Sequence, residues 1–211
     1  MSTLPNDSTS KVVNARVVCR IRPQNQNEKK SGGLSCIEHS NKGIEVYTSL
    51  GQYPFDCDHI FDENASQSDL FNYCARPHVE DALAGINSTI LAFGQTGSGK
   101  TYSIEGDIND PDRIGIVPRT LLALFNAAIE RIETAEFGFK ISFIEIYMEK
   151  IKDLLIEEKT ASPQKQNTVK IVGVEVTEKS IFTYEQFMKY WKAGKRCNCW
   201  KYSSFKYVLF L

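Results

Sequence analysis

Apolar residues alternate with polar or charged residues in several short stretches of this chain, and this period of two predicts β-strands. The alternating stretches lie at residues 44–47, 53–60 and 139–147. Strands are also predicted at residues 12–21, where charges interrupt β-branched residues, and at residues 169–176. Apolar residues recur instead at helical spacing in three longer stretches, at residues 66–85, 118–132 and 184–193. Strands and helices thus follow one another along the chain, which is typical of the α/β class.

Polar, glycine-containing stretches separate the predicted elements. Residues 25–33 are predicted to be a polar loop, and residues 106–115 a long loop inserted into one helix. The first long helix is expected to begin at a Ser66 cap and to stop at Gly85, while Gly194 is expected to close the last helix. The short strands before the first long helix indicate a small β-lobe.

The composition is that of an ordinary globular chain. Its 211 residues, 42% hydrophobic and 24% charged, favour one domain or at most two. A formal net charge of −1 argues against binding to nucleic acid or to a membrane through overall charge. No stretch reaches the ~18 consecutive apolar residues of a membrane span, so we expect a cytoplasmic protein.

Six cysteines are scattered through the chain without the C-x-x-C spacing of zinc sites. They are Cys19, Cys36, Cys57, Cys74, Cys197 and Cys199. This usage favours free thiols in a reducing compartment over a disulfide framework. Cys197 and Cys199 could share a metal ion, but no matching Cys or His pair follows them, so free thiols remain the preferred interpretation.

A glycine-rich motif follows the apolar run at residues 89–93, which we predict to be a buried central strand. The motif fits the pattern G-x-x-x-x-G-K-[ST] and consists of Gly94, Gln95, Thr96, Gly97, Ser98, Gly99, Lys100 and Thr101. A helix is predicted to open after Lys100. A flexible Gly/Ser turn could match by chance, but the strand before the motif and the helix after it favour a phosphate-binding loop.

The residue types in this motif suit a nucleoside triphosphate. Backbone N–H groups of such a loop point at phosphate oxygens, and the positive end of the following helix favours the same charge. Lys100 would add a point charge for the β- and γ-phosphates, and the Thr101 hydroxyl would suit Mg²⁺. The loop alone leaves open whether the chain is a motor, a nucleotide kinase, a GTPase or a DNA-remodelling ATPase.

Four ordered segments of the sequence resemble the motor domain of the kinesin family. Residues 90–102, ILAFGQTGSGKTY, closely resemble the kinesin version of the loop. The other three are residues 17–23 (VVCRIRP), similar to the family's R-x-R-P motif, residues 115–119 (GIVPR) and residues 143–155 (FIEIYMEKIKDLL). Together they cover about residues 12–196. The segment YMEKI resembles most the conventional, plus-end-directed kinesins.

The resemblance implies a P-loop NTPase fold with a central mixed β-sheet flanked by helices, ATP and Mg²⁺ as ligands, and microtubules as partner on the cytoskeleton. It also implies that Arg20 and Pro23 flank the adenine, with Tyr102 closing the other face. A flat ring can stack on proline or tyrosine, and a guanidinium can lie against it. The role of Arg22 stays open, because a pair of arginines on a strand can also be simply solvated.

Two further roles follow from the resemblance. Residues 107–113 would form the drug-sensitive loop near the nucleotide, and residues 150–170 would reach the track. Lysines in the second stretch are interspersed with acidic residues, and residues 157–167 are a charged, proline-containing loop, so a solvated mixed-charge face is a near-equal alternative. For Glu145, which alternates with apolar neighbours on its strand, we prefer a structural role.

The sequence departs from the family pattern after Arg196. The serine-rich switch N-x-x-S-S-R-S-H and the Asp-Leu-Ala-Gly switch are not found, and Ser203-Ser204 lacks the Arg-Ser-His continuation. We therefore expect a disordered tail at residues 1–11, a partial and incomplete motor domain at residues 12–196, and a divergent end at residues 197–211.

These switches position the attacking water and sense the γ-phosphate in a motor of this family. We therefore expect little or no ATPase activity from a polypeptide of these 211 residues. Microtubule-stimulated phosphate release well above that of a Lys100→Ala variant would refute this expectation.

Our interpretation is the ATP-binding part of a microtubule motor, an ATP hydrolase by family. The first alternative is a non-catalytic fragment that holds a nucleotide or a partner. The second is a P-loop nucleotide kinase or GTPase, which would need a base-specificity motif or a lid of basic residues, and neither is found.

Overall fold

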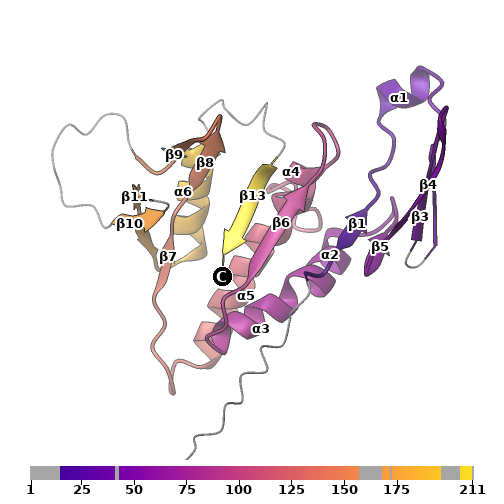
Figure 1. The fold of residues 1–211 in the computed structure, drawn as a ribbon. Helices are drawn as coiled ribbons and strands as arrows, with labels where there is room; N and C mark the ends of the chain where they lie inside the picture. The colour runs from indigo at the N-terminus through magenta and orange to yellow at the C-terminus, as the bar shows by residue number, and fades with distance from the viewer. Residues whose placement is uncertain (1–14, 41–42, 157–167, 172, 196–204, 211) are drawn as a thin grey trace, which may run out of the picture. The chain divides into compact units, whose positions relative to one another are not determined.

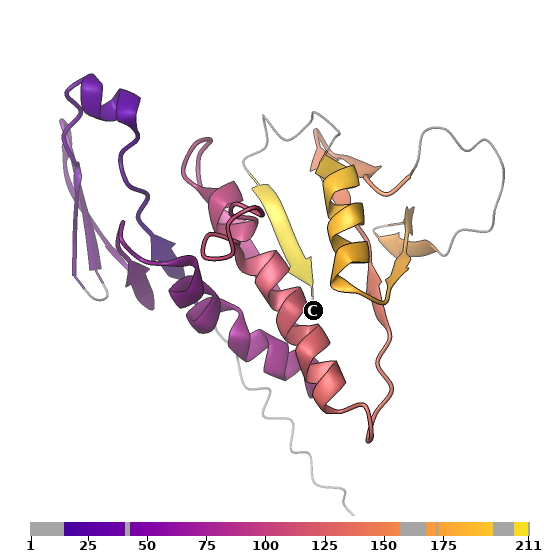
Figure 2. The same ribbon diagram turned by 180° about the vertical axis from the view of Figure 1, so that it is seen from behind.

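The computed structural model describes residues 15–40, 43–156, 168–171, 173–195 and 205–210. The chain divides into two compact units, the first spanning Met1–Asn64 and the second Ala65–Leu211. Figures 1 and 2 show the elements of each unit from opposite sides, and each unit is described by itself.

The first unit is built from short strands. A two-stranded parallel ladder joins β1 (Val18–Arg20) to β5 (His59–Phe61). A three-stranded antiparallel sheet joins β2 (Ile37–His39), β3 (Gly43–Thr48) and β4 (Gly51–Asp56) in that order. This arrangement confirms the predicted small β-lobe.

The predicted single strand over residues 53–60 is wrong, because the chain turns between β4 and β5. The turn is fixed by Asp58, whose carboxylate accepts a hydrogen bond from the Val17 N–H at 2.6 Å and whose own N–H donates to the Val17 carbonyl at 2.8 Å. These two bonds align the start of β5 with β1.

The predicted polar loop over residues 25–33 is also wrong, because it contains the helix α1 (Gln26–Lys30). The Asn25 side chain accepts from the Glu28 N–H at 2.9 Å, and the Glu28 carboxylate accepts from the Asn25 N–H at 2.7 Å. This reciprocal pair is a capping box, which satisfies two N–H groups that a helix start leaves without partners.

The second unit has a helical layer that carries much of the apolar core. It consists of α2 (Gln67–Cys74), α3 (Arg76–Leu83) and α5 (Ile116–Glu130). In Figures 1 and 2, α2 and α3 follow one another end to end and α5 runs alongside them. Its buried apolar side chains include Leu70, Phe71, Ala75, Val79, Ile116, Val117 and Leu124.

The single helix predicted over residues 66–85 is in fact α2 followed by α3. Ser66 caps the start, accepting from the Asp69 N–H at 3.0 Å, and Gly85 follows the end with a φ of 82°, so both predicted boundaries are confirmed. The break falls at Ala75. Pro77 explains it, because proline has no N–H to continue the helical hydrogen bonds and its ring clashes with the preceding turn.

The strand predicted at residues 89–93 is present as β6 (Thr89–Phe93), but its predicted burial is wrong. It pairs antiparallel with β13 (Phe205–Phe210), and Leu91 and Phe93 are 53% and 73% exposed. The apolar run therefore predicted the strand correctly, whereas burial depends on what covers each face, which the run itself does not encode.

The remaining strands of the second unit form three antiparallel pairs. These are β7 (Phe139–Ile141) with β12 (Lys179–Ile181), β8 (Ile144–Tyr147) with β9 (Lys150–Asp153), and β10 (Thr168–Ile171) with β11 (Val174–Thr177). The predictions of one strand over residues 139–147 and one over residues 169–176 are thus wrong. In the second case Gly173, with a φ of 81°, lies in the turn that folds the segment into a hairpin.

The last helix, α6 (Tyr184–Lys195), continues through Gly194, so the predicted stop there is wrong. A Cβ at Gly194 would overlap the Phe143 ring, and that ring stacks on Trp191 with centroids 5.0 Å apart. Gly194 is therefore a packing residue, which lets the aromatic ring lie against the helix.

Within the described residues, no helix combines the length and apolar character needed to cross a membrane. Over the same residues, no group of three or more His, Cys, Asp or Glu side chains is placed to hold a metal ion. Cys19, Cys36, Cys57 and Cys74 are free thiols. The predictions for residues 1–11, 157–167, Cys197, Cys199 and Ser203-Ser204 lie outside the described residues.

Candidate functional site

The glycine-rich loop connects the end of β6 to the start of α4 (Lys100–Ile104), as predicted. Three of its residues have positive φ angles: Gly94 at 149°, Gly97 at 84° and Gly99 at 99°. Only glycine adopts such angles readily, so the three glycines let the loop reverse direction within a few residues. Gly99, in the left-handed region, is the residue from which α4 begins.

The loop is wound tightly around Ser98. A Cβ on Gly94 would lie 2.5 Å from the Ser98 Oγ, so a side chain at position 94 would force this hydroxyl to move. Within the part of the chain that the structure describes, this buried hydroxyl has no hydrogen-bond partner. A buried polar atom without a partner is costly, so the hydroxyl is suited to a ligand that brings an acceptor.

Lys100 is the charged group of the loop, and its side chain is only 6% exposed. Its Nζ donates to the carbonyls of Gly94 at 2.6 Å and Gln95 at 2.8 Å. The structure therefore brings the ammonium group to the first two residues of the motif, six positions back along the chain.

Thr101 and Tyr102 follow Lys100 on α4 and are both exposed. The Arg113 guanidinium lies over the Tyr102 ring, with Cζ 5.9 Å from the ring centroid. A side-chain hydrogen bond to Tyr102 raises the pKa of Arg113 above its ordinary value. Tyr102 is thus linked to the loop that separates α4 from α5.

That loop, the predicted insertion at residues 106–115, is held from both sides by side chains. Arg119 of α5 donates to the carbonyls of Ile114, Pro111 and Asp112 at 2.9, 3.1 and 3.0 Å. The buried Gln67 of α2 donates to the carbonyls of Tyr102 at 2.6 Å and Arg113 at 3.1 Å. These bonds fix the loop beside α4.

Sequence reasoning did not identify Gln67 and Arg119 as positioning residues. Arg119 ends the segment GIVPR that resembles the family, so a signal for it was present. Gln67 follows a helix cap directly and carries no signal in the sequence, because its two carbonyl partners are 35 and 46 residues away.

The other two predicted adenine residues, Arg20 and Pro23, lie in the first unit. Arg20 ends β1 and is partly buried, and Pro23 is exposed. Arg22, whose role the sequence left open, makes local contacts in the first unit. Its guanidinium donates to the Glu28 carboxylate at 2.5 Å and to the Pro23 carbonyl at 3.0 Å. This hydrogen bond to Arg22 lowers the pKa of Glu28.

Cys19, which precedes Arg20 on β1, has a half-buried thiol. Burial, with a smaller contribution from Cys57, raises the pKa of Cys19 above its ordinary value. The thiol is therefore protonated at neutral pH and is a weak nucleophile.

The stretch predicted to reach the track begins with the β8–β9 hairpin. Its turn residues Met148 and Glu149 have φ angles of 46° and 63°, and both are exposed together with Lys150 and Lys152. Glu145 is opposite Lys152 in the strand register, in keeping with a structural cross-strand role.

Comparison with known proteins gives one consistent result. The family model "Kinesin motor domain" matches residues 20–205. "Kinesin-related protein 3" of Dictyostelium discoideum is 40% identical over 177 residues, covering 81% of this chain and 15% of that protein. "Kinesin-1 heavy chain" of Homo sapiens is 40% identical over 147 residues, covering 70% of this chain and 15% of that protein.

A solved structure described as "Structure of a fast kinesin: Implications for ATPase mechanism and interactions with microtubules" is similar in fold. The TM-score is 0.71 at 30% sequence identity, and the match covers 86% of this chain and 52% of the other. The chain spans about 15% of the length of the first two curated relatives.

Proposed function

The chain belongs to the kinesin motor-domain family, and we propose that its glycine-rich loop binds ATP with Mg²⁺ as the nucleotide site of a microtubule motor. Kinesin motor domains bind nucleotide, and the observation that supports this role for residues 94–101 is the geometry of the loop. It combines three glycines at positive φ, a buried ammonium group and a buried hydroxyl between a strand and a helix.

The residues of the loop fit a triphosphate. Gly94 leaves space that any Cβ would fill, so a phosphate can approach the backbone closely there. The Ser98 Oγ–H gains an acceptor when a phosphate oxygen is present. The two carbonyls that now accept from Lys100 are neutral, so an anionic oxygen competes with them effectively for the ammonium protons.

Lys100 and Thr101 have different tasks in this proposal. The Lys100 ammonium balances the negative charge of the β- and γ-phosphates and takes no part in a proton transfer. The exposed Thr101 hydroxyl, on the first turn of α4, offers an oxygen ligand to Mg²⁺. Bound Mg²⁺ would neutralise charge that builds up on the phosphates during transfer.

We further propose that Arg20, Pro23 and Tyr102 hold the adenine. Arg113 lies over the Tyr102 ring, so the tyrosine is held in place for stacking. Gln67 and Arg119 would serve the site indirectly, by fixing the loop of residues 106–115 that begins just after α4.

The motor activity itself is proposed from the family. In this proposal the chain is the ATP-binding part of a motor that couples ATP hydrolysis to movement along microtubules, in the cytoplasm and on the cytoskeleton. The fast kinesin whose structure is similar in fold interacts with microtubules. The β8–β9 hairpin is our candidate for a contact with the track, because it exposes Lys150 and Lys152 on strand β9.

Sedimentation with microtubules in the presence of a non-hydrolysable ATP analogue tests the track contact. We expect the chain to pellet with microtubules, and the double variant Lys150→Glu/Lys152→Glu to reduce the pelleted fraction severalfold, because tubulin is strongly acidic and the charges are reversed. Lys189→Glu/Lys192→Glu, which reverses two exposed lysines on α6, is the matched control and should leave pelleting unchanged.

A chain that binds ATP but does not pellet with microtubules would support the alternative, a non-catalytic nucleotide-binding fragment. Equal losses in the two double variants would show that the hairpin has no special part in binding the track.

A further inference from the structure

A hollow of about 540 Å³ lies in the second unit, at the end of α5 that is remote from the glycine-rich loop. The α5 helix begins beside the loop of residues 106–115 and ends at the hollow, about 22 Å further on for 15 residues. The hollow is therefore separate from the proposed nucleotide site.

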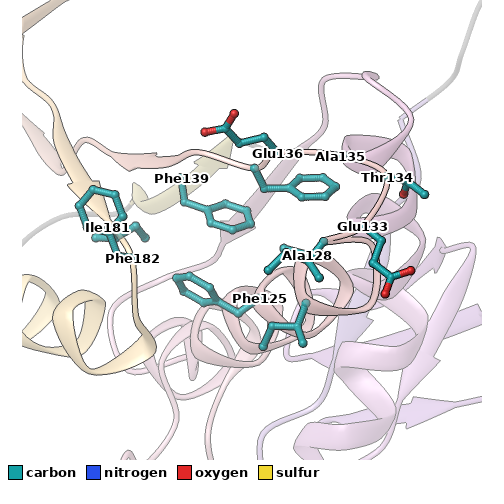
Figure 3. A pocket seen from close by; sticks show the side chains of 12 residues that line it. Phe125, Ala128, Glu133, Thr134, Ala135, Glu136, Phe139, Ile181 and Phe182 are labelled. Atoms are coloured by element: carbon teal, nitrogen blue, oxygen red, sulfur yellow. The ribbon is translucent and has the colours of Figure 1, made fainter.

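Apolar side chains form the floor and one wall of this hollow. They are Phe125, Ala128, Ile129, Ile132, Phe137, Phe139, Ile181 and Phe182. Figure 3 shows the rings of Phe125 and Phe139 directed toward each other, and their centroids are 4.8 Å apart. Ile181 and Phe182, at the end of β12, close the opposite side.

Much of this apolar surface is in contact with water. Ile129 is 66% exposed, and Ile132 and Phe182 are each 75% exposed. Single exposed apolar residues are common, but a contiguous group of them around a hollow marks a binding surface. The described chain therefore presents apolar area that an occupant would remove from water.

The charge at the rim indicates what kind of occupant fits. The only charged residues that line the hollow, within the described chain, are Glu133 and Glu136. Figure 3 shows both carboxylates pointing away from the aromatic rings, toward the outside. The α5 helix ends next to them, and the C-terminal end of a helix carries a partial negative charge. The apolar floor favours an apolar group. The acidic rim and the negative end of the helix favour a cation attached to that group.

We propose that this hollow is a docking site for a basic, amphipathic peptide segment of a partner protein, with bulky apolar side chains on the floor and lysine or arginine at the two glutamates. A peptide suits the site because the hollow is lined from both α5 and the end of β12, so the side chains of one amphipathic segment can contact both.

The probe is a fluorescein-labelled peptide of 12 residues made of leucine, phenylalanine and lysine, with a counterpart in which every lysine is replaced by glutamate. Fluorescence anisotropy should show saturable binding of the lysine peptide, and binding at least about tenfold weaker for the glutamate peptide, since each attraction becomes a repulsion.

Two variants locate the binding. Glu133→Lys/Glu136→Lys should weaken binding of the lysine peptide about tenfold and strengthen binding of the glutamate peptide, a reversal that unfolding cannot produce. Phe182→Ser should weaken binding of both peptides, because it removes an exposed apolar contact without touching the core. The matched controls are Glu80→Lys and Ile86→Ser, exposed residues outside the hollow, which should change neither affinity.

The proposal is overturned if the control variants weaken binding as much as Glu133→Lys/Glu136→Lys and Phe182→Ser do. The peptide would then adhere to the surface without binding at the hollow. It is equally overturned if sedimentation shows a dimer of this chain that the Phe182→Ser change dissolves, because the occupant would then be a second copy. Failure of ATP binding has no bearing on these outcomes, so the two proposals are tested separately.

Discussion

Replacing Lys100 with alanine is expected to weaken the binding of ATP at least about a hundredfold, a change of ~3 kcal/mol in binding free energy. The ammonium group is the positive charge that the glycine-rich loop itself supplies, and it is almost fully buried in the fold of that loop. A buried charge acts in a low dielectric, where its attraction to phosphate is much stronger than at the surface. Isothermal titration with ATP and Mg²⁺ measures the change.

Lys150→Ala is the matched control, because Lys150 is an exposed lysine on the β8–β9 hairpin. It should leave ATP affinity within about twofold of the parent. Thermal unfolding of Lys100→Ala separates loss of binding from loss of fold, since the loop also loses two hydrogen bonds to carbonyls. A folded Lys100→Ala chain that binds ATP within about threefold of the parent would remove Lys100 from the site.

Gly115→Ala is expected to destabilise the second unit by about 2–3 kcal/mol. A Cβ at Gly115 would lie 2.5 Å from backbone atoms of both Ile104 and Glu105, and backbone cannot move aside as a flexible side chain can. The Gly115 N–H also donates to the Glu105 carbonyl at 2.7 Å, a bond that displacement would stretch. Urea denaturation, read as a shift in the midpoint at constant slope, measures the loss.

Gly138→Ala is the control, because no atom lies within 4 Å of its ideal Cβ and its φ is not positive. It should be neutral or slightly stabilising, since alanine restricts the unfolded chain. Equal midpoints for the two variants would mean that the junction of α4 and the loop of residues 106–115 is not tightly packed. If Gly115→Ala binds ATP more weakly while still folded, that junction also positions the site.

The sequence predicted the strand–loop–helix conformation around residues 94–101 well because the information for it is local. The positive φ angles, the strand before and the helix after follow from residues 89–104 themselves. The comparisons confirm the kinesin-like α/β fold, and the resemblance found in four short segments led to the same family.

Predictions failed where a distant or neighbouring residue overrode the local pattern. Helical spacing continued through residues 66–85, but Pro77 broke the helix in two. Glycine often ends a helix, but Gly194 lies within α6. Its lack of a side chain leaves room for the Phe143 ring to pack against the helix. The pairing of β13 with β6 joins segments more than 100 residues apart, and no local pattern encodes such a partner.

The assignments of Arg20, Pro23, Tyr102 and Thr101 remain predictions. Thr101 came from the phosphate-loop motif and the other three from the resemblance, and Arg20 and Pro23 lie in a different unit from the loop. The structure adds a set of contacts around Tyr102 that the sequence did not predict. Arg113 lies over the Tyr102 ring, and Gln67 donates hydrogen bonds to the carbonyls of both residues.

The most direct test is calorimetric titration of the purified chain, shown by circular dichroism to be folded, with ATP in the presence of Mg²⁺ and again with a chelator. We predict one saturable site whose affinity falls when Mg²⁺ is removed. A folded chain that takes up no ATP in either condition would contradict the assignment of residues 94–101 as a nucleotide site.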